Sequence, residues 1–113
     1  MPDDSMLSAE DAKLVTLART SRARNSSPEG AAVRDRDGRT YVATAVDLPS
    51  LRLSALQAAV AMAVSSGATG LEAAAVVGED QQPDVTVVRD LAGADVVVHL
   101  ADPAGRPQAT VRT

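Results

Sequence analysis

Side chains able to act as metal ligands or nucleophiles are scarce in this chain. It contains no cysteine and a single histidine, His99, within 113 residues. A catalytic zinc site needs three protein ligands, usually imidazoles, thiolates or carboxylates, and an open position for water. The lack of cysteine excludes thiol catalysis, disulfides and thiolate metal sites together. We therefore predict no catalytic residue, no metal and no cofactor.

The remaining polar candidates have structural explanations. His99 follows Val97 and Val98 in an apolar run that is typical of a strand. A metal site needs partner ligands, and none accompany this histidine, so we expect a hydrogen-bonded core or interface residue. A second group of charged residues surrounds Gly38 and is typical of a solvated turn. Its members are Asp35, Arg36, Asp37 and Arg39.

Composition and charge exclude several functions. The net charge of −4 and the isoelectric point near 4.8 disfavour nucleic acid as a partner. Arg19, Arg22 and Arg24 form a local basic cluster, which is favourable at the last turn of a helix. The N-terminus lacks the basic and apolar regions of a signal peptide. The longest apolar stretch runs from Leu53 to Val64, shorter than the about 20 residues of a membrane span. We expect a cytoplasmic, bacterial protein with no membrane contact.

Hydrophobic periodicity and turn signals predict one α/β domain over residues 8–113, after a flexible tail of residues 1–7. Helices are expected from Ser8 to Ser21, from Leu53 to Ser66 and from Asp84 to Leu91. Strands are expected from Gly30 to Val33, from Thr40 to Val46, from Leu71 to Val77, from Val96 to Leu100 and from Gln108 to Arg112. This alternation favours a mixed sheet covered by helices. The segment from Asp84 to Leu91 is either a helix or a strand, because Val85 to Val88 is equally typical of a strand.

Three strings support a family resemblance. They are residues 27–33 (SPEGAAV) with the turn at residues 37–39, residues 55–67 (ALQAAVAMAVSSG) and residues 73–77 (AAAVV). These strings resemble the first hairpin, the central helix and the third strand of the cytidine deaminase family, in its small homotetrameric form that acts on free nucleosides. The resemblance covers most of the chain. It implies a three-layer α/β/α sandwich with a central five-stranded mixed sheet.

The same resemblance shows where the family's active site would lie. Its Cys-Ala-Glu, which supplies a zinc ligand and the proton-transferring acid, falls on Ser54, Ala55 and Leu56. Its Pro-Cys-x-x-Cys, which supplies two more ligands, falls at residues 83–87, and its ribose-binding Asn-x-Glu falls at residues 45–47. Ligands and acid are replaced throughout. The expected vestigial pocket consists of Asp47, Ser54, Ala55, Leu56, Pro83, Asp84 and Val87.

The replacement residues have two interpretations. In the first, helix caps stand where ligands stood, because Ser54 and Gln57 have the spacing of a capping box and Asp84 after Pro83 is suited to the start of the next helix. In the second, two adjacent helix starts form a small anion or nucleotide-phosphate site, which the charge of Asp84 opposes. Asp47 is either a retained sugar contact or a cap for a helix beginning near Ser50.

Two functions are compatible with these residues. The first is a non-catalytic module that associates with itself, as a dimer or tetramer, or with a protein partner. It is motivated by the helix from Leu53 to Val64, which is apolar on nearly every side and is expected to be buried all round. The alternative is a module that binds a nucleoside or nucleotide in the vestigial pocket. Cytidine deamination is the least favoured function. Activation of water by zinc and proton transfer by a carboxylate each contribute several kcal/mol to such a reaction, and the aligned positions supply neither.

Overall fold

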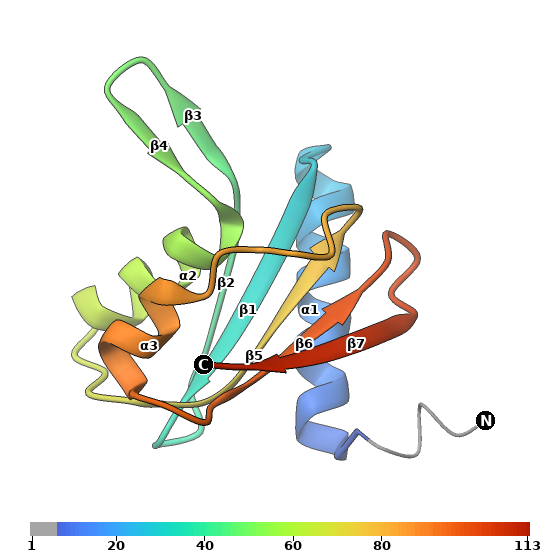
Figure 1. The fold of residues 1–113 in the computed structure, drawn as a ribbon. Coiled ribbons are helices and arrows are strands. Elements are labelled where there is room, and N and C mark those ends of the chain that lie inside the picture. Colours follow the sequence, from blue (N-terminus) through green and yellow to red (C-terminus); the bar gives the residue numbers. More distant parts are fainter. Residues whose placement is uncertain (1–6) are drawn as a thin grey trace.

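The computed structural model describes residues 7–113, which form a main sheet with helices on both faces and a separate two-stranded hairpin (Figure 1). The helices are α1 (Ala9–Asn25), α2 (Ala55–Ser65) and α3 (Thr86–Ala92). The strands are β1 (Glu29–Asp35), β2 (Thr40–Thr44), β3 (Val46–Leu48), β4 (Leu51–Leu53), β5 (Leu71–Gly78), β6 (Val97–Ala101) and β7 (Pro107–Arg112). The tail predicted for residues 1–7 lies outside the described residues except for Leu7, which packs against the core.

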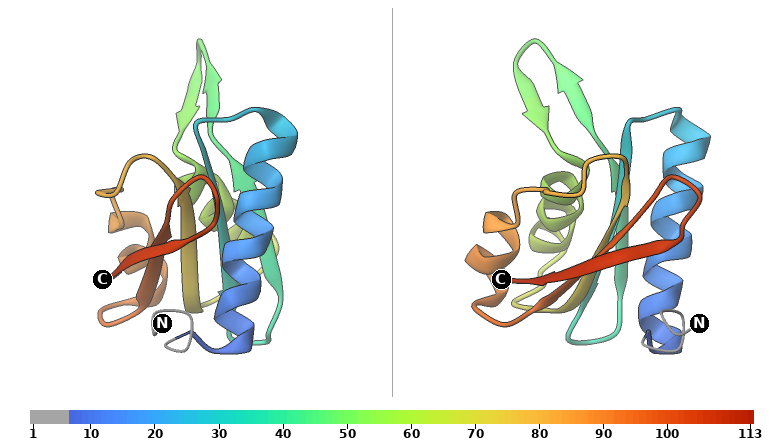
Figure 2. Two further views of the ribbon diagram at one scale, coloured as in Figure 1. Left: turned by 90° about the vertical axis from the view of Figure 1, so that its right-hand side faces the viewer. Right: turned by 45° about the vertical axis from the view of Figure 1, so that its right-hand side comes forward.

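The main sheet has five strands in the order β2-β1-β5-β6-β7. Only β5 and β6 are parallel, whereas each other neighbouring pair is antiparallel, including the predicted pair β6 and β7. Helix α1 covers one face, and α2 and α3 cover the other, which gives three layers (Figure 2). The predicted α/β/α sandwich with a five-stranded mixed sheet is confirmed. Within residues 7–113 no helix has the length and hydropathy that crossing a membrane requires.

Small side chains fill the two cores. The core under α1 contains Leu14, Val15 and Ala18 with alanines of the sheet, and the core under α2 is built around Leu56, Val60 and Leu100. Gly30 of β1 lies directly against α1, where an added Cβ would collide with the carbonyl oxygen of Ala18. Because interiors are close-packed, helix and sheet approach this closely only where side chains are small or absent.

The ends of α1 follow from local hydrogen bonds. Ser8 caps the helix as predicted, its hydroxyl accepting from the Asp11 amide at 3.0 Å. The helix continues past the predicted end at Ser21 to Asn25, because the chain breaks only at Ser26, which has a left-handed φ of 50°. Arg22 and Arg24 lie in the last turn, where cations are favourable.

The segment between β2 and α2 differs from the prediction. Residues 46–53 form a hairpin, β3 with β4, that projects beyond the main sheet (Figures 1 and 2). The expected strand from Thr40 to Val46 therefore stops at Thr44, and the helix expected from Leu53 begins only at Ala55. The proposed cap by Asp47 is wrong, because no helix starts near Ser50. Asp47 instead pairs with Arg52 across the hairpin, Oδ1 to Nε 3.2 Å.

Helix α2 is also less buried than predicted. Ala55, Leu56 and Val60 lie in the core, but Met62 and Val64 are 46 % and 52 % exposed. The expectation of burial all round is wrong for a single chain, because the sheet covers only one side of the helix. The opposite side presents apolar atoms to solvent.

A network of charges fixes α1 to the sheet. The Asp11 carboxylate accepts from Arg34 of β1 at 2.8 Å and from the ring Nε2 of His99 of β6 at 2.7 Å. Arg34 also donates to Glu72 of β5 at 2.8 Å. Burial raises the pKa of Asp11, but the hydrogen bonds that its carboxylate accepts from His99 and Arg34, with the charge of Arg34, outweigh burial and hold this pKa below its usual value. Asp11 is therefore ionised near neutral pH and links one helix to two strands.

We expect Asp11→Asn to lower the free energy of unfolding at pH 7 by about 2 kcal/mol, because Arg34 and His99 lose a charged acceptor. Since the folded pKa of Asp11 is depressed, its contribution is complete above the unfolded pKa of about 3.8 and is lost as the pH falls through the folded pKa. The difference between wild type and variant should therefore shrink in acid. Urea unfolding followed by circular dichroism at several pH values measures it.

Glu10→Gln is the matched control, because Glu10 is an exposed acid in the same first helical turn. It should change stability by less than about 0.5 kcal/mol. Equal effects of the two substitutions would contradict the role assigned to Asp11.

Candidate functional site

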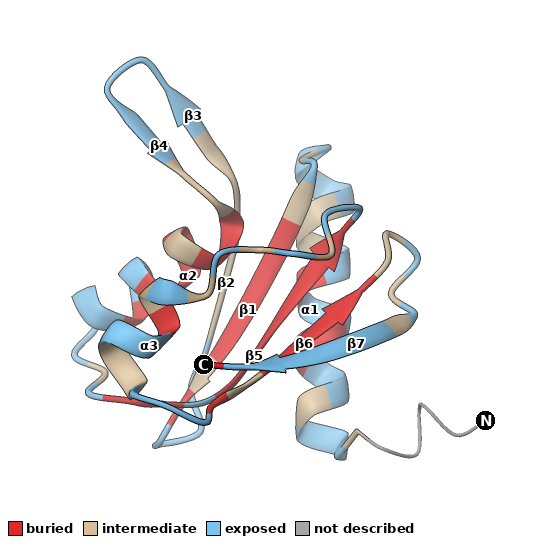
Figure 3. Cartoon of the chain, in the orientation of Figure 1, coloured by how far each residue is buried: buried red, intermediate tan, exposed pale blue. Residues whose placement is uncertain are grey.

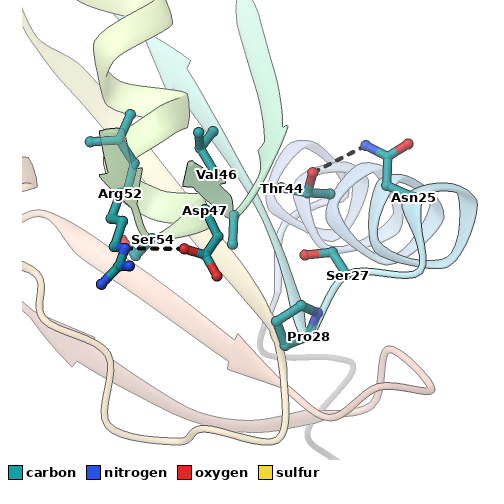
Figure 4. A pocket seen from close by; sticks show the side chains of 10 residues that line it. Asn25, Ser27, Pro28, Thr44, Val46, Asp47, Arg52 and Ser54 are labelled. Carbon is teal, nitrogen blue, oxygen red and sulfur yellow. Dashed lines mark hydrogen bonds and ion pairs between the residues drawn. The ribbon is translucent and has the colours of Figure 1, made fainter. Parts of the chain in front are cut away.

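An open pocket of about 840 Å³ lies where α1, β2, the hairpin and α2 meet (Figure 4). Polar and apolar side chains share its walls. Asn25 donates to the Thr44 hydroxyl at 3.1 Å on one side, and the Asp47–Arg52 ion pair lies on the other. Its lining residues are Asn25, Ser27, Pro28, Thr44, Ala45, Val46, Asp47, Arg52, Leu53 and Ser54. The pocket thus includes Asp47 and Ser54 of the predicted set.

The first turn of α2 closes one end of this pocket through a complete capping box. The Ser54 hydroxyl accepts from the Gln57 amide at 3.1 Å, and the Gln57 side chain accepts from the Ser54 amide at 2.9 Å. This confirms the predicted cap. The hydroxyl at the position of the family's first zinc ligand is therefore engaged with its own helix.

Glu29 occupies the same helix start from outside the helix. Its carboxylate Oε1 accepts from the Ala55 amide at 2.7 Å. A carboxylate at a helix N-terminus is stabilised both by the amide and by the helix dipole. The amides of Ser54, Ala55 and Gln57 all have side-chain acceptors, and the charge of Glu29 repels a second anion. This arrangement weighs against the anion-site interpretation.

The next two predicted residues are buried rather than facing the pocket. Ala55 and Leu56 are 0 % and 1 % exposed and belong to the core under α2. Leu56 stands at the position that the resemblance assigns to the proton-transferring acid. In this chain that position is surrounded by apolar side chains.

The second helix start holds the remaining predicted residues. Asp84 is exposed, and its Oδ1 accepts from the Thr86 hydroxyl at 2.6 Å and from the Thr86 amide at 2.9 Å, bonds that lower its pKa. The segment is helical, as one of the two interpretations predicted, although α3 begins at Thr86 and Val85 is the formal cap residue. Val87 packs against the core, and Pro83 lies in the preceding loop.

These residues do not fit the zinc ion that the family resemblance implies. Ser54 is held in its capping box, Val87 has no donor atom, and Asp84 is the one ligating side chain at the aligned positions. No group of three or more His, Cys, Asp or Glu side chains within residues 7–113 is arranged to hold a metal. We derive no chemistry through a metal for this chain.

Two polar residues away from the pocket bear on the sequence predictions. His99 is 6 % exposed and bonded to Asp11, which confirms the prediction of a hydrogen-bonded core residue. The prediction that Asp35 belongs to a solvated turn is wrong, because this residue is only 2 % exposed. Burial raises the pKa of Asp35, but hydrogen bonds from the Arg39 amide, the Tyr41 hydroxyl and the Asp37 amide outweigh it and lower the pKa. Asp35 therefore organises the β1–β2 turn.

Sequence reasoning missed the role of Glu29 at the start of α2 and the place of Arg52 in the pocket. Glu29 directly precedes a small apolar run, which is a usable signal that its side chain has a specific partner. Its partner lies 26 positions away, however, and sequence spacing does not reveal such a pair. Arg52 entered the pocket only because of the hairpin that was not predicted.

Substitutions at the start of α2 should distinguish the contributions of Ser54 and Glu29 to the free energy of unfolding. We expect Ser54→Ala to cost about 1 kcal/mol, as for other N-caps. Glu29→Ala should cost about 2 kcal/mol, because a charge-assisted bond to the Ala55 amide is lost. Ser50→Ala, at the exposed hairpin tip, serves as the control and should be close to neutral. A neutral result for Glu29→Ala in urea unfolding would show that its carboxylate does not hold this helix start.

Comparison with known proteins agrees with this geometry. A family model described as cytidine deaminase-like matches residues 7–105. Among solved structures, cytidine deaminase from Burkholderia pseudomallei has a TM-score of 0.74 at 22 % identity, with 95 % of this chain and 92 % of that chain covered. Cytidine deaminase from Mycobacterium tuberculosis has a TM-score of 0.64 at 25 % identity, with 96 % and 90 % covered.

A search of curated proteins gave no significant match. The family model nevertheless spans most of the described residues, and the sheet order and helix layers agree with it. The chain belongs to the cytidine deaminase-like family.

Proposed function

We propose that this protein is a non-catalytic member of its family that acts as a self-associating interaction or scaffold module. The main support for a non-catalytic role is the position of Leu56. The family's proton-transferring acid maps to this residue, which is 1 % exposed in the apolar core. General acid–base catalysis needs a titratable group within reach of the substrate, and this position offers none.

The start of α2 supports the same conclusion. Ser54 stands where the family has a zinc ligand, and its hydroxyl is committed to the Gln57 amide. The Ala55 amide is committed to Glu29. These contacts stabilise the helix start in the absence of a metal. What was a reaction centre in the family is here a structural junction.

Self-association is supported by the uncovered side of α2. Met62 and Val64 are large apolar side chains, each about half exposed, on a helix whose other side builds the core. A helix that is apolar on both sides is usually covered on both sides. In the homotetrameric type that the sequence resembles, neighbouring subunits provide this cover. We propose a second copy of the chain as the partner of this side of α2, in a dimer or tetramer.

A second candidate function is nucleoside or nucleotide binding without catalysis. It is favoured by the pocket of about 840 Å³, whose volume lies in the usual range for small-molecule sites. Asn25, Thr44, Asp47 and Arg52 offer it hydrogen-bonding groups. Against it stands the openness of the site to solvent and the ion pair between Asp47 and Arg52, both of which are largely exposed.

Incubation with cytidine distinguishes these functions in one sample. For repurified protein, with and without added zinc, we expect no uridine by chromatography and no change in Tm. A ligand at 100 times its Kd stabilises a protein by about 2.7 kcal/mol, so binding would be visible. A Tm shift without uridine would favour the second candidate, and the panel would then include other nucleosides and nucleotides. Uridine formation that survives repurification would overturn the proposal.

The double variant Met62→Lys, Val64→Lys tests the proposed interface. We expect light scattering to give a multiple of the chain mass for wild type at micromolar concentration and a smaller multiple for the variant, because desolvating two ammonium groups opposes association. Thr20→Lys, Ala23→Lys on exposed positions of α1 makes the same charge change and should leave the mass unchanged. A wild-type monomer, or equal loss in both variants, would contradict the interface.

A further inference from the structure

Strand β7 forms an open edge of the main sheet. It pairs with β6 on one side, and no other described element lies beyond it (Figures 1 and 3). All residues from Gln108 to Arg112 are exposed, although the neighbouring β6 is largely buried. The opposite edge strand, β2, differs because α1 and α2 pack against it and its residues 41–44 are half-buried. The two edge strands therefore differ in exposure, and β7 is the more exposed.

The hydrogen bonds at the end of β7 show which backbone groups face outward. The Thr113 amide donates to the Val96 carbonyl at 3.1 Å, and the Thr113 carbonyl accepts from the Asp95 amide at 2.9 Å, so both groups of Thr113 point to the β6 side. Successive residues of a strand alternate in direction. The register is continuous from Val97↔Arg112 to Leu100↔Ala109. The amides and carbonyls of Thr110 and Arg112 therefore face away from the sheet.

This edge has little of the protection that usually prevents strand pairing. Native edges are blunted by proline, lysine, bulges or an inward-pointing charge. In β7 the proline is the first residue, Pro107, and the arginine is the last, Arg112. The stretch between them, Gln108-Ala109-Thr110-Val111, contains neither a charge nor a proline. An unprotected central segment with outward-facing amides is a template for another strand.

We propose that β7 pairs antiparallel with β7 of a second copy about a twofold axis at Thr110, joining two five-stranded sheets edge to edge. This register sets Thr110 opposite Thr110 of the second copy, Ala109 opposite Val111 and Gln108 opposite Arg112. Thr–Thr pairs and apolar pairs that lie directly opposite each other stabilise neighbouring strands. An axis at Ala109 would instead set Arg112 opposite Arg106, which places like charges together. The register about Thr110 sets no like charges together, and this self-complementarity favours a second copy over an unrelated partner.

This surface is independent of the proposed α2 interface. Helix α2 packs on β1 and β2, at the other end of the sheet from β7. The inference therefore does not rest on the proposed function. An isologous contact at each of the two surfaces would extend an assembly beyond a dimer.

Cysteine cross-linking tests the register, because the chain has no native cysteine. Directly opposite, hydrogen-bonded residues have Cα atoms about 5.5 Å apart, within the range that a disulfide spans. With the thiol oxidant diamide, Thr110→Cys should give several-fold more covalent dimer than Thr20→Cys, an exposed threonine of α1. Val111→Cys should cross-link less than Thr110→Cys, because its twin lies diagonally, about 7–8 Å away.

The experiment is repeated in the Met62→Lys, Val64→Lys background, so that failure of the α2 interface and failure of the β7 pairing are distinguishable. Preferential cross-linking of Thr110→Cys in both backgrounds supports the proposal. Yields equal to those of Thr20→Cys, or a higher yield for Val111→Cys, overturn it. Light scattering then compares the Met62→Lys, Val64→Lys variant with the same variant carrying Thr110→Lys. Thr110→Lys sets two ammonium groups opposite each other across the axis, so it should remove any dimer that the double variant still forms. Circular dichroism confirms that each variant keeps its fold.

Discussion

The close approach of α1 to the sheet is the constraint on which the rest of the fold depends. Gly30 and Ala18 touch backbone to backbone, and no Cβ fits between them. Around this contact the cores are filled by alanine, valine and leucine, with Tyr41 as the one aromatic residue of the chain. Small side chains gain little from area burial individually, so their contribution comes from dense packing. The ionic network of Asp11, Arg34 and His99 then fixes the helix over β1 and β6.

Hydrogen bonds within the chain also stabilise the two helix starts at which the family resemblance places metal ligands. A metal held at such helix starts would couple their stability to ligand binding. In this chain Ser54 and Glu29 satisfy the start of α2, and Asp84 bonds the first amide of α3. Each helix start thus has at least one backbone amide bonded by a side chain of this chain. The chain keeps the family fold, and its own side chains bond the amides at both helix starts.

Local patterns were predictable, and contacts between distant segments were not. Ser8 and the pair Ser54 and Gln57 act over three residues, and the structure confirms both caps. The β3–β4 hairpin escaped prediction because each strand has only three residues, too few to show an alternating pattern around Pro49. In the sequence Asp35 is one charge among several in a turn, and its bonds to Tyr41 and to two amides of the turn show why it is buried. The pocket depended on that hairpin, so its outline could be predicted only in part.

The bond between Asp11 and His99 has a consequence for synthesis. Its partners are 88 positions apart, and β6 must also pair in parallel with β5 through a crossover. During translation α1 and the β1–β2 hairpin emerge early, yet the charge network that fixes α1 is incomplete until β6 has left the ribosome. Non-local pairings of this kind slow folding and expose strand edges meanwhile. The contact between α1 and His99 can therefore form only after almost the whole chain has been synthesised, and docking of α1 is completed at a late step of folding.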